Sequence, residues 1–304
     1  MADFDAILIG GTGQRFGVVL GWLGLLGLAE VPRRTLVIDA EGTAYHSEAS
    51  DRLRSLFQFA RSSQIVFQNV PPYDVGCAGA GGWDDGGPEN GPNNSVAAAK
   101  ALNYPIHDLW KLSFTKSEAG LDIHQGFMAN PKVAASVFTS HALMGDDGAN
   151  LVKSFLPSER DHRPLLIVGS LAGGTGAGLM YSVAMECRRN MTPEPSHPIL
   201  GIAFSNYLDL GDQADNARLE QNSQFGTEFL YRRWLDSTGE DYPFDLLALI
   251  GPPPGAKLVP PSPNGVHEFP GFLVAAKLVA DGCLKLQQTV APDFTGQGAN
   301  GVNQ

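Results

Sequence analysis

The sequence is poor in cysteine, and its few cysteines lie far apart. Cys77, Cys187 and Cys283 are the three cysteines among 304 residues, and they form no CxxC pair. A disulfide framework and a structural zinc site both need cysteines at short, regular spacings, so neither is expected. The absence of a disulfide framework is typical of proteins of the reducing cytosol, and we therefore expect a cytoplasmic protein.

Positive charge is also scarce. The chain has 21 lysines and arginines against 32 aspartates and glutamates, which gives a net charge of -11 at neutral pH. Proteins that bind nucleic acid neutralise its phosphates with a basic surface, so a nucleic-acid partner is not expected. A single nucleotide remains possible as a ligand, because backbone N–H groups can hold its phosphates without lysines.

Long apolar runs and several common catalytic motifs are missing as well. The most apolar segment, GVVLGWLGLLGLAEV at 17–31, is shorter than the roughly 20 residues that a membrane-spanning helix needs. We interpret it as a buried helix behind the first strand and expect no membrane span. The sequence contains neither a Walker A motif nor a GxSxG nucleophile elbow, and it identifies no catalytic residue.

What the sequence does contain is an alternation of short apolar runs with longer helical patterns. Unbroken runs such as LLIV and ILGIAF are typical of parallel strands that are covered on both faces. Their alternation with helices predicts an α/β fold with a doubly wound, mostly parallel sheet and helices on both faces. The expected strands are 4–10, 35–39, 64–70, 164–170, 199–204 and 245–251, and the expected helices are 18–28, 50–61, 131–143, 178–190, 216–235 and 271–288.

Composition also divides the chain. We expect a single nucleotide-binding domain over residues 1–290, followed by a flexible tail at 291–304. Residues 71–98, which include AGAGGWDDGGPENGPNN, read as a glycine- and proline-rich insertion. Residues 251–265, GPPPGAKLVPPSPNG, hold too many prolines for a helix or a central strand.

The first candidate site is the glycine-rich segment GGTGQRFG, which follows the first expected strand. Glycines there allow a phosphate to approach the backbone closely, and the start of the next helix supplies free N–H groups. The spacing differs from the GxGxxG of dinucleotide sites. The nucleotide-binding residues that we predict in it are Gly10, Gly11, Thr12, Gly13 and Gln14.

Two acids follow the second expected strand. Asp39 and Glu41 lie in the segment IDAEG. An acid at this place can accept hydrogen bonds from a ribose, or it can lie near a Mg²⁺ ion beside the phosphates.

A third segment, GFMANPK, precedes the helix expected at 131–143. Asn-Pro ends the preceding segment, and Pro131 suits the first turn of a helix. Ala129 and Asn130 therefore mark another helix N-terminus that can face an anion.

The fourth segment, SLAGGTGAG, carries four glycines within six residues. Such a density costs chain entropy, and we interpret it as bare backbone that contacts a chain of phosphates, with the hydroxyl of Thr175 as an added donor. The predicted binding residues are Ala172, Gly173, Gly174, Thr175 and Gly176.

At this segment the chain resembles a known family. AGGTGAG resembles the tubulin/FtsZ signature GGGTG(S/T)G, GGTGQRFG is similar in spacing to tubulin's AGQCGNQIG, and GFMANPKVAA is similar to the FtsZ loop GAGANPEVG, which faces the γ-phosphate. IDAEG stands where the family has an acidic loop, and DNARL, with Asn216 and Arg218, is similar to the ribose-contacting YNATL of tubulin. The resemblance spans about 1–290 and implies a protein that binds GTP or GDP with Mg²⁺ and either self-associates or binds a partner protein.

Two features of that family have no match. Its central helix carries an aromatic residue and, four residues on, an asparagine that reads guanine, whereas Phe269 and Phe272 are followed at that spacing by Leu273 and Ala276. Its catalytic NxDxxD loop has no counterpart in APDFTGQGANGVNQ, where Asp293 stands alone.

Three functions therefore remain open. The first is a GTP-binding protein with slow GTP hydrolysis, acting in a filament or complex. The second is a non-catalytic nucleotide sensor that recruits partner proteins. The third is an NAD(P)-dependent Rossmann oxidoreductase that uses GGTGQRFG and Asp39, although the sequence has no Tyr-x-x-x-Lys pair.

Overall fold

The computed structural model describes the parts of the chain that form the predicted sheet and most of its covering helices. The described residues are 4–39, 52–53, 55–56, 64–66, 127, 129–135, 152, 155–156, 163–191, 197–209, 213–237, 242–252 and 270–279. The predicted insertion at 71–98, most of the proline-rich segment 251–265, the tail at 291–304 and Glu41 lie outside them.

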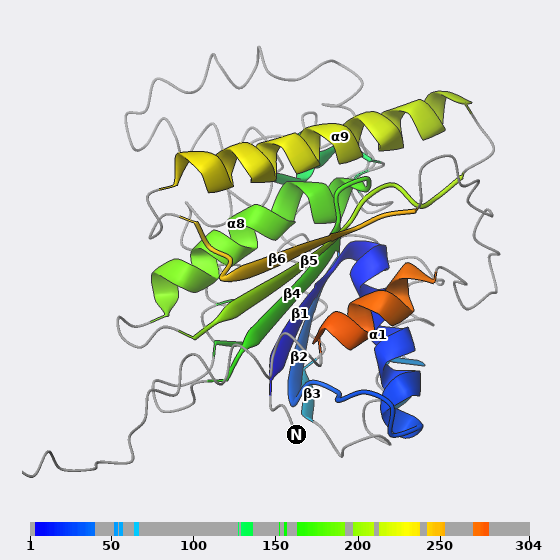
Figure 1. The fold of residues 1–304 in the computed structure, drawn as a ribbon, viewed down its shortest axis with the longest axis vertical. Helices are drawn as coiled ribbons and strands as arrows, with labels where there is room; N and C mark the ends of the chain where they lie inside the picture. The colour runs from blue at the N-terminus through cyan, green and yellow to red at the C-terminus, as the bar shows by residue number, and fades with distance from the viewer. Residues whose placement is uncertain are drawn as a thin grey trace, which may run out of the picture.

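The sheet has six strands, all paired in parallel, in the order β3-β2-β1-β4-β5-β6 (Figure 1). Every expected strand has an observed counterpart, although only 64–66 of the strand expected at 64–70 is described. The strands are β1 (Asp5–Ile9), β2 (Arg34–Ile38), β3 (Gln64–Val66), β4 (Leu165–Ser170), β5 (Ile199–Phe204) and β6 (Leu246–Ile250).

The three long helices are α1 (Gly10–Leu25), α8 (Gly174–Asn190) and α9 (Gln213–Asp236). The predicted starts of α1 at 18 and of α8 at 178 were wrong, because the first glycine-rich segment and residues 174–178 of the second are already helical. Glycine has low helix propensity, so sequence reasoning treats such segments as loops, whereas tertiary packing holds them in a helix here. Shorter helical segments occupy 131–135 and 271–279. Within the described ranges, no helix is both long and apolar enough to span a membrane.

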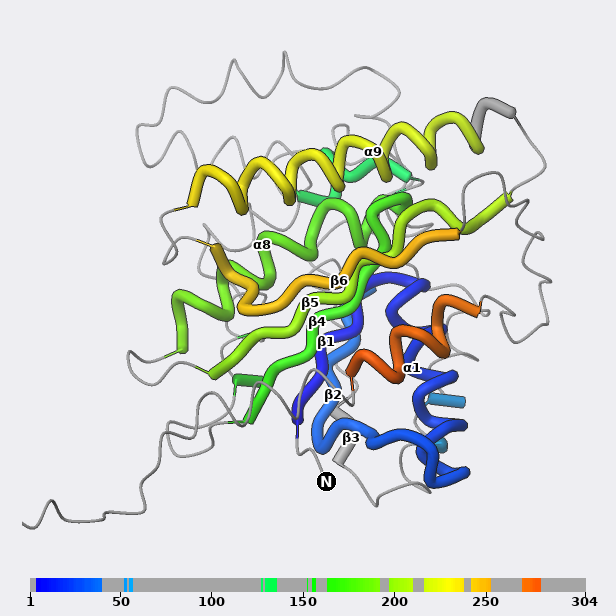
Figure 2. Tube along the Cα trace, in the orientation of Figure 1, coloured from blue at the N-terminus to red at the C-terminus, as the bar shows by residue number. Residues whose placement is uncertain are grey.

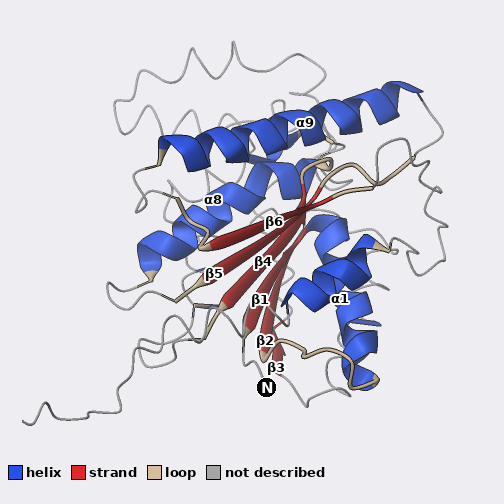
Figure 3. Ribbon diagram, viewed as in Figure 1, coloured by secondary structure: helices blue, strands red, loops and turns tan. Residues whose placement is uncertain are grey.

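Helices cover both faces of the sheet, as Figure 3 shows: α8 and α9 lie on one side, and α1 lies on the other with the helix at 271–279. Successive residues of a strand point to opposite faces, so the strands contribute alternately to two apolar clusters. On β1, for example, Ile7 and Ile9 belong to the α8 side, whereas Ala6 and Leu8 belong to the α1 side. This confirms the predicted doubly wound α/β architecture.

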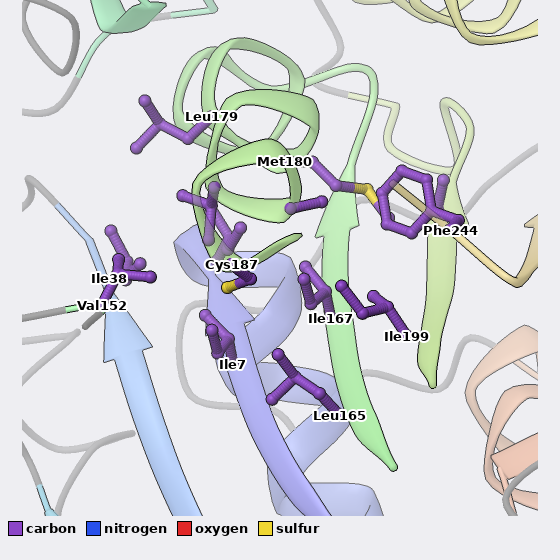
Figure 4. Packing of buried hydrophobic residues seen from close by; sticks show 14 of the residues in the cluster. Ile7, Ile38, Val152, Leu165, Ile167, Leu179, Met180, Cys187, Ile199 and Phe244 are labelled. Atoms are coloured by element: carbon purple, nitrogen blue, oxygen red, sulfur yellow. The ribbon is translucent and has the colours of Figure 1, made fainter. Parts of the chain in front are cut away.

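The cluster on the α8 side contains a buried thiol. Figure 4 shows Cys187 of α8 among Ile7, Leu165 and Ile167, all of them fully buried. Burial disfavours the charged thiolate and raises the pKa of Cys187 far above its ordinary value, with a smaller contribution from Glu186. A thiol in this environment packs as an apolar side chain.

We expect Cys187 to resist alkylation in the native protein, because the thiolate is the reactive form and the sulfur has no solvent access. Iodoacetamide labelling at neutral pH, followed by peptide mass spectrometry, should leave the Cys187 peptide unmodified in buffer and label it in guanidinium chloride. Labelling of that peptide at equal rates in the two solvents would contradict the packing shown in Figure 4.

Candidate functional site

The candidate site lies where the winding of the sheet changes direction. The chain proceeds from β1 outward to β2 and β3 on one side, and from β4 outward to β5 and β6 on the other (Figure 2). In open α/β sheets, ligands bind outside the carboxyl ends of the strands at such a switch point. Both glycine-rich segments begin there, since Gly10 follows β1 directly and Gly174 opens the helix that follows β4.

The N-termini of α1 and α8 touch each other at this point. A Cβ atom placed on Gly10 would lie 3.2 Å from Cβ of Thr175 and 3.5 Å from the backbone nitrogen of Gly176. Gly10 also has a φ of +69°, a conformation that glycine adopts without strain. The first turn of a helix offers N–H groups without intrahelical partners and the positive end of the helix dipole, so two adjoining N-termini favour an anion.

The Ala129–Asn130 segment joins them. A Cβ on Gly174 would lie 2.6 Å from Cβ of Phe127 and 3.0 Å from the backbone nitrogen of Asn130. The backbone N–H of Asn130 and its side-chain Nδ2 both donate to the carbonyl oxygen of Phe127, at 2.8 and 3.1 Å. These bonds close a turn in which Ala129 has a φ of +57° and which leads directly into the helix at 131–135. Three of the segments predicted from sequence are therefore brought together.

The glycines of the second glycine-rich segment have different structural roles. A Cβ on Gly176 would collide with the backbone carbonyl of Ser170, and one on Gly178 would collide with the carbonyl of Pro131. Close packing thus accounts for these positions and for Gly174, whereas sequence analysis attributed the glycine density to a ligand alone. Gly173 differs, because a Cβ on it would meet no atom of the described residues within 4 Å.

Gly173 is the N-cap of α8, with extended backbone angles (φ -78°, ψ 169°) and no side chain that caps the helix. Any L-residue can adopt this conformation. Neither backbone strain nor packing against the described residues therefore requires glycine at this position, and those residues leave space beside the N-terminus of α8. A phosphate that approaches the backbone would fill that space.

We expect Gly176→Ala to lower the free energy of unfolding by about 1–3 kcal/mol, the usual cost of overpacking, despite the better helix propensity of alanine. The added methyl would press on the backbone of Ser170, whose nitrogen lies 2.5 Å from the Cβ position. Urea denaturation followed by circular dichroism measures the change. Gly173→Ala is the matched control: its methyl group meets no atom of the described residues within 4 Å, so the change in stability should stay within about 1 kcal/mol, because the poorer N-cap preference of alanine opposes its lower entropy in the unfolded chain.

The polar side chains of the first glycine-rich segment point into the protein. The hydroxyl of Thr12 is hydrogen-bonded to the hydroxyl of Tyr207 at 3.0 Å, and Nε2 of Gln14 donates to Oδ2 of Asp39 at 2.7 Å. Thr12 and Gln14 are both buried. A ligand at this segment would therefore meet its backbone and not these two side chains, and Gln14 fixes Asp39 beside the first turns of α1.

A metal site made by the protein alone is not found in the described part of the chain. Among those residues, no group of three or more His, Cys, Asp and Glu side chains is arranged to hold a metal ion. A Mg²⁺ ion that accompanies a nucleotide needs only one or two carboxylates in addition to phosphate oxygens and waters. Asp39, at the carboxyl end of β2, is the described acid that suits this role.

The predicted ribose contacts, Asn216 and Arg218, lie farther along the chain, as does the aromatic residue Phe272. Nδ2 of Asn216 donates to Oδ1 of Asp209 at 2.7 Å, and Arg218 is exposed on α9. Phe272 is fully buried and packs edge-on against Phe204, with ring centroids 4.9 Å apart. Its ring therefore belongs to the core and does not offer a face to a base.

Sequence reasoning missed one residue that connects the site. Nδ2 of Asn222, on α9, donates to the carbonyl oxygens of Ala129 (2.7 Å) and Ala172 (3.0 Å). A single polar residue on a long helix carries no motif, so nothing in the sequence pointed to it.

Comparisons with known proteins complete the description. No protein-family model matches the chain, and no curated protein matches it in sequence. It is similar in structure to the GDP-bound monomer of CetZ1 from Haloferax volcanii (12% identity, TM-score 0.45), covering 92% of this chain and 58% of that one. The GTPγS-bound protofilament of CetZ2 from Haloferax volcanii (11% identity, TM-score 0.45) matches over 96% of this chain and 61% of that one.

A short-chain dehydrogenase/reductase from Burkholderia phymatum in complex with NAD is similar at a lower TM-score of 0.31 and 11% identity, covering 96% of this chain and 98% of that one. The chain thus spans about three fifths of the length of the two CetZ proteins. All three similarities concern the fold alone.

Proposed function

We propose that this chain is a tubulin/FtsZ-like nucleotide-binding protein that takes GTP or GDP at the switch point between β1 and β4. The observation that carries the proposal is the meeting of three segments there: Gly10 adjoins Thr175, and Gly174 adjoins Asn130. These are the segments whose sequences resemble the family's phosphate loops. The protein positions a chain of phosphates with backbone N–H donors. Such donors are needed because the net charge of -11 does not favour the binding of phosphates.

The three segments have distinct roles in the proposal. The N–H groups of Gly11–Gln14 and of Gly173–Gly176 bind the phosphates, with the hydroxyl of Thr175 as a further donor. The Ala129–Asn130 turn closes the phosphate end, since it contacts Gly174 directly. Asp39, Glu41, or both help to hold Mg²⁺, which neutralises phosphate charge when it is bound. Asn216 and Arg218 lie toward the ribose.

The second candidate is an NAD(P)-binding Rossmann protein. Two observations favour it: the strand order β3-β2-β1-β4-β5-β6 is that of dinucleotide-binding folds, and Asp39 ends β2, where such proteins place a ribose-binding acid. A dinucleotide, however, needs only the first glycine-rich turn. The contact of Gly174 with Phe127 and Asn130 would then serve no ligand.

Identification of the bound nucleotide separates the two candidates. The protein is purified without added nucleotide, denatured, and its released ligands are separated by chromatography. Guanine nucleotides are the expected result, and NAD(P) would overturn the proposal. Calorimetry on nucleotide-free protein should then show tighter binding of GTP than of GMP, because the proposed donors contact the terminal phosphates.

A slow GTPase and a non-catalytic sensor both remain compatible with this site. Phosphate release, measured at rising protein concentration, distinguishes them: a hydrolase that acts between subunits turns over faster per chain as the concentration rises.

We propose a cytoplasmic protein that self-associates or binds a partner protein. Large apolar side chains exposed on α9, among them Phe225 and Trp234, support the association. Sedimentation with and without GTP tests it.

A further inference from the structure

Asn222 occupies a place that the phosphate contacts alone do not explain. It lies on α9, which is not one of the helices that begin at the switch point. Its side chain nevertheless reaches the carbonyl oxygens of Ala129 and Ala172, at 2.7 and 3.0 Å. These two carbonyls belong to two different segments of the proposed site, which are far apart in the sequence.

The chemistry of the amide suits this double contact. A side-chain amide nitrogen carries two N–H groups in one plane, and here each carbonyl accepts one of them. An aspartate of the same shape has only acceptors at this position and would face two carbonyl oxygens. The two hydrogen bonds also fix which end of the amide is nitrogen.

The contact with Ala172 sets the direction of a donor in the site. In a planar trans peptide the carbonyl of one residue and the N–H of the next point in opposite directions. Because the Ala172 carbonyl is held by Asn222, the N–H of Gly173 points away from α9. A Cβ on Gly173 would also meet no atom of the described residues within 4 Å.

The contact with Ala129 holds a residue in an unfavourable conformation. The φ of +57° at Ala129 lies in the left-handed region, which is unfavourable for an alanine. A hydrogen bond to its carbonyl helps to keep that turn closed, and the turn carries Asn130 against Gly174.

Two neighbouring turns of α9 contact the same region. A Cβ on Gly226, one turn after Asn222, would lie 3.1 Å from Cβ of Leu171, so α9 packs closely against the start of the glycine-rich segment. The hydroxyl of Ser223 accepts a hydrogen bond of 2.9 Å from the backbone N–H of Asn206, in the segment after β5. α9 is therefore seated on several loops at the carboxyl edge of the sheet.

We propose that Asn222 is a positioning residue of the nucleotide site, which ties the Ala129–Asn130 turn to the Ala172–Gly173 peptide and thereby orients the Gly173 N–H toward the phosphates. This inference rests on the proposed function, because it assigns a role within that site. Through the two hydrogen bonds of Asn222, the geometry of the phosphate donors depends on α9.

The test compares Asn222→Ala and Asn222→Asp with Glu228→Ala on the same helix, where Glu228 forms an exposed ion pair with Arg232. Binding of GTP and of guanosine is measured by calorimetry on each folded variant. We expect GTP affinity to fall about tenfold or more in Asn222→Ala, and further in Asn222→Asp, with guanosine affinity unchanged. Glu228→Ala should bind both as the unchanged protein does. Equal losses for GTP and guanosine, or no loss, would overturn the assignment.

Hydrogen exchange of the ligand-free protein separates this inference from the proposed function. Asn222→Ala should speed exchange of amides at 129–131 and 172–176 relative to Glu228→Ala, at matched global stability. Unchanged exchange would show that Asn222 does not tie the segments, whatever the ligand. If the unchanged protein binds no guanine nucleotide, the proposed function and the positioning role both fail, while faster exchange would still show that the tie exists.

Discussion

Gly173→Asp is expected to weaken GTP binding strongly while it stabilises the folded protein. Aspartate is a preferred N-cap residue, and its carboxylate would accept a hydrogen bond from a backbone N–H in the first turn of α8, which Gly173 leaves uncapped. The loss of glycine also restricts the unfolded chain, and together these effects should raise the free energy of unfolding by about 0.5–1 kcal/mol. The same carboxylate would occupy the space and the donors that we assign to a phosphate.

The expected loss of GTP affinity is about hundredfold or more, because at least two hydrogen bonds to a charged group are lost and a like charge is added. Calorimetry gives the affinity, and thermal denaturation gives the stability. Gly173→Asn is the matched control: it caps the helix with nearly the same shape and no charge, so it should stabilise similarly and bind GTP more tightly than Gly173→Asp. If both variants bind GTP as the unchanged protein does, the phosphates do not lie at the N-terminus of α8.

Substitution of Gly176 should lower the free energy of unfolding, whereas Gly173→Asp should raise it. These opposite signs distinguish a glycine that packing requires from a glycine that suits a ligand. A side chain at Gly176 would press on the backbone of Ser170, whereas a Cβ at Gly173 has no neighbour within 4 Å in the part of the chain that the structure describes. A helix N-terminus that is left uncapped so that it can bind phosphate therefore makes the ligand-free protein less stable than one with a capping residue would be. An anion site at the start of α8 requires that no side chain occupies the N–H groups of the first turn. Glycine at position 173 meets this requirement, although aspartate would stabilise the fold.

The sequence predicted the strands well, because buried parallel strands are short apolar runs that contrast with their surroundings. β4 and β5, for instance, were expected within one residue of their observed bounds. The predicted starts of α1 and α8 were wrong for one physical reason. Glycine disfavours a helix when considered residue by residue, yet Gly13 lies so close to Leu8 that a Cβ would fall 2.9 Å from its carbonyl carbon, and only a glycine helix fits there.

The candidate site was predictable in its segments but not in its connections. Parallel strands bring their carboxyl ends to one edge, so motifs that follow β1 and β4 were bound to meet there. The hydrogen bond from the side chain of Gln14 to Asp39, by contrast, joins two of the predicted segments in a way that their motifs do not indicate. Asn222 could not be found, because its role depends on where two distant carbonyls lie in space.

A charge cluster around one buried carboxylate, at the opposite edge of the sheet, supports this arrangement. Asp5, the first residue of β1, is fully buried, and its Oδ2 lies 2.7 Å from Nη2 of Arg34 and 3.7 Å from Nη2 of Arg163. Arg34 opens β2, and Arg163 precedes β4, so one carboxylate joins the starts of three adjacent strands. These strands include both strands of the switch point.

We expect Asp5→Asn to destabilise the protein by about 3–5 kcal/mol, because a buried ion pair that loses one partner leaves the other charge uncompensated in a poorly solvated place. Asparagine keeps the shape of the side chain, so the loss reports charge rather than packing. Glu228→Gln, which removes the charge of the exposed pair with Arg232, should cost no more than about 1 kcal/mol. Urea denaturation of both variants measures the two losses. Equal, small losses would show that the Asp5 cluster is as well solvated as the surface pair, and the three strand starts would then depend on apolar packing alone.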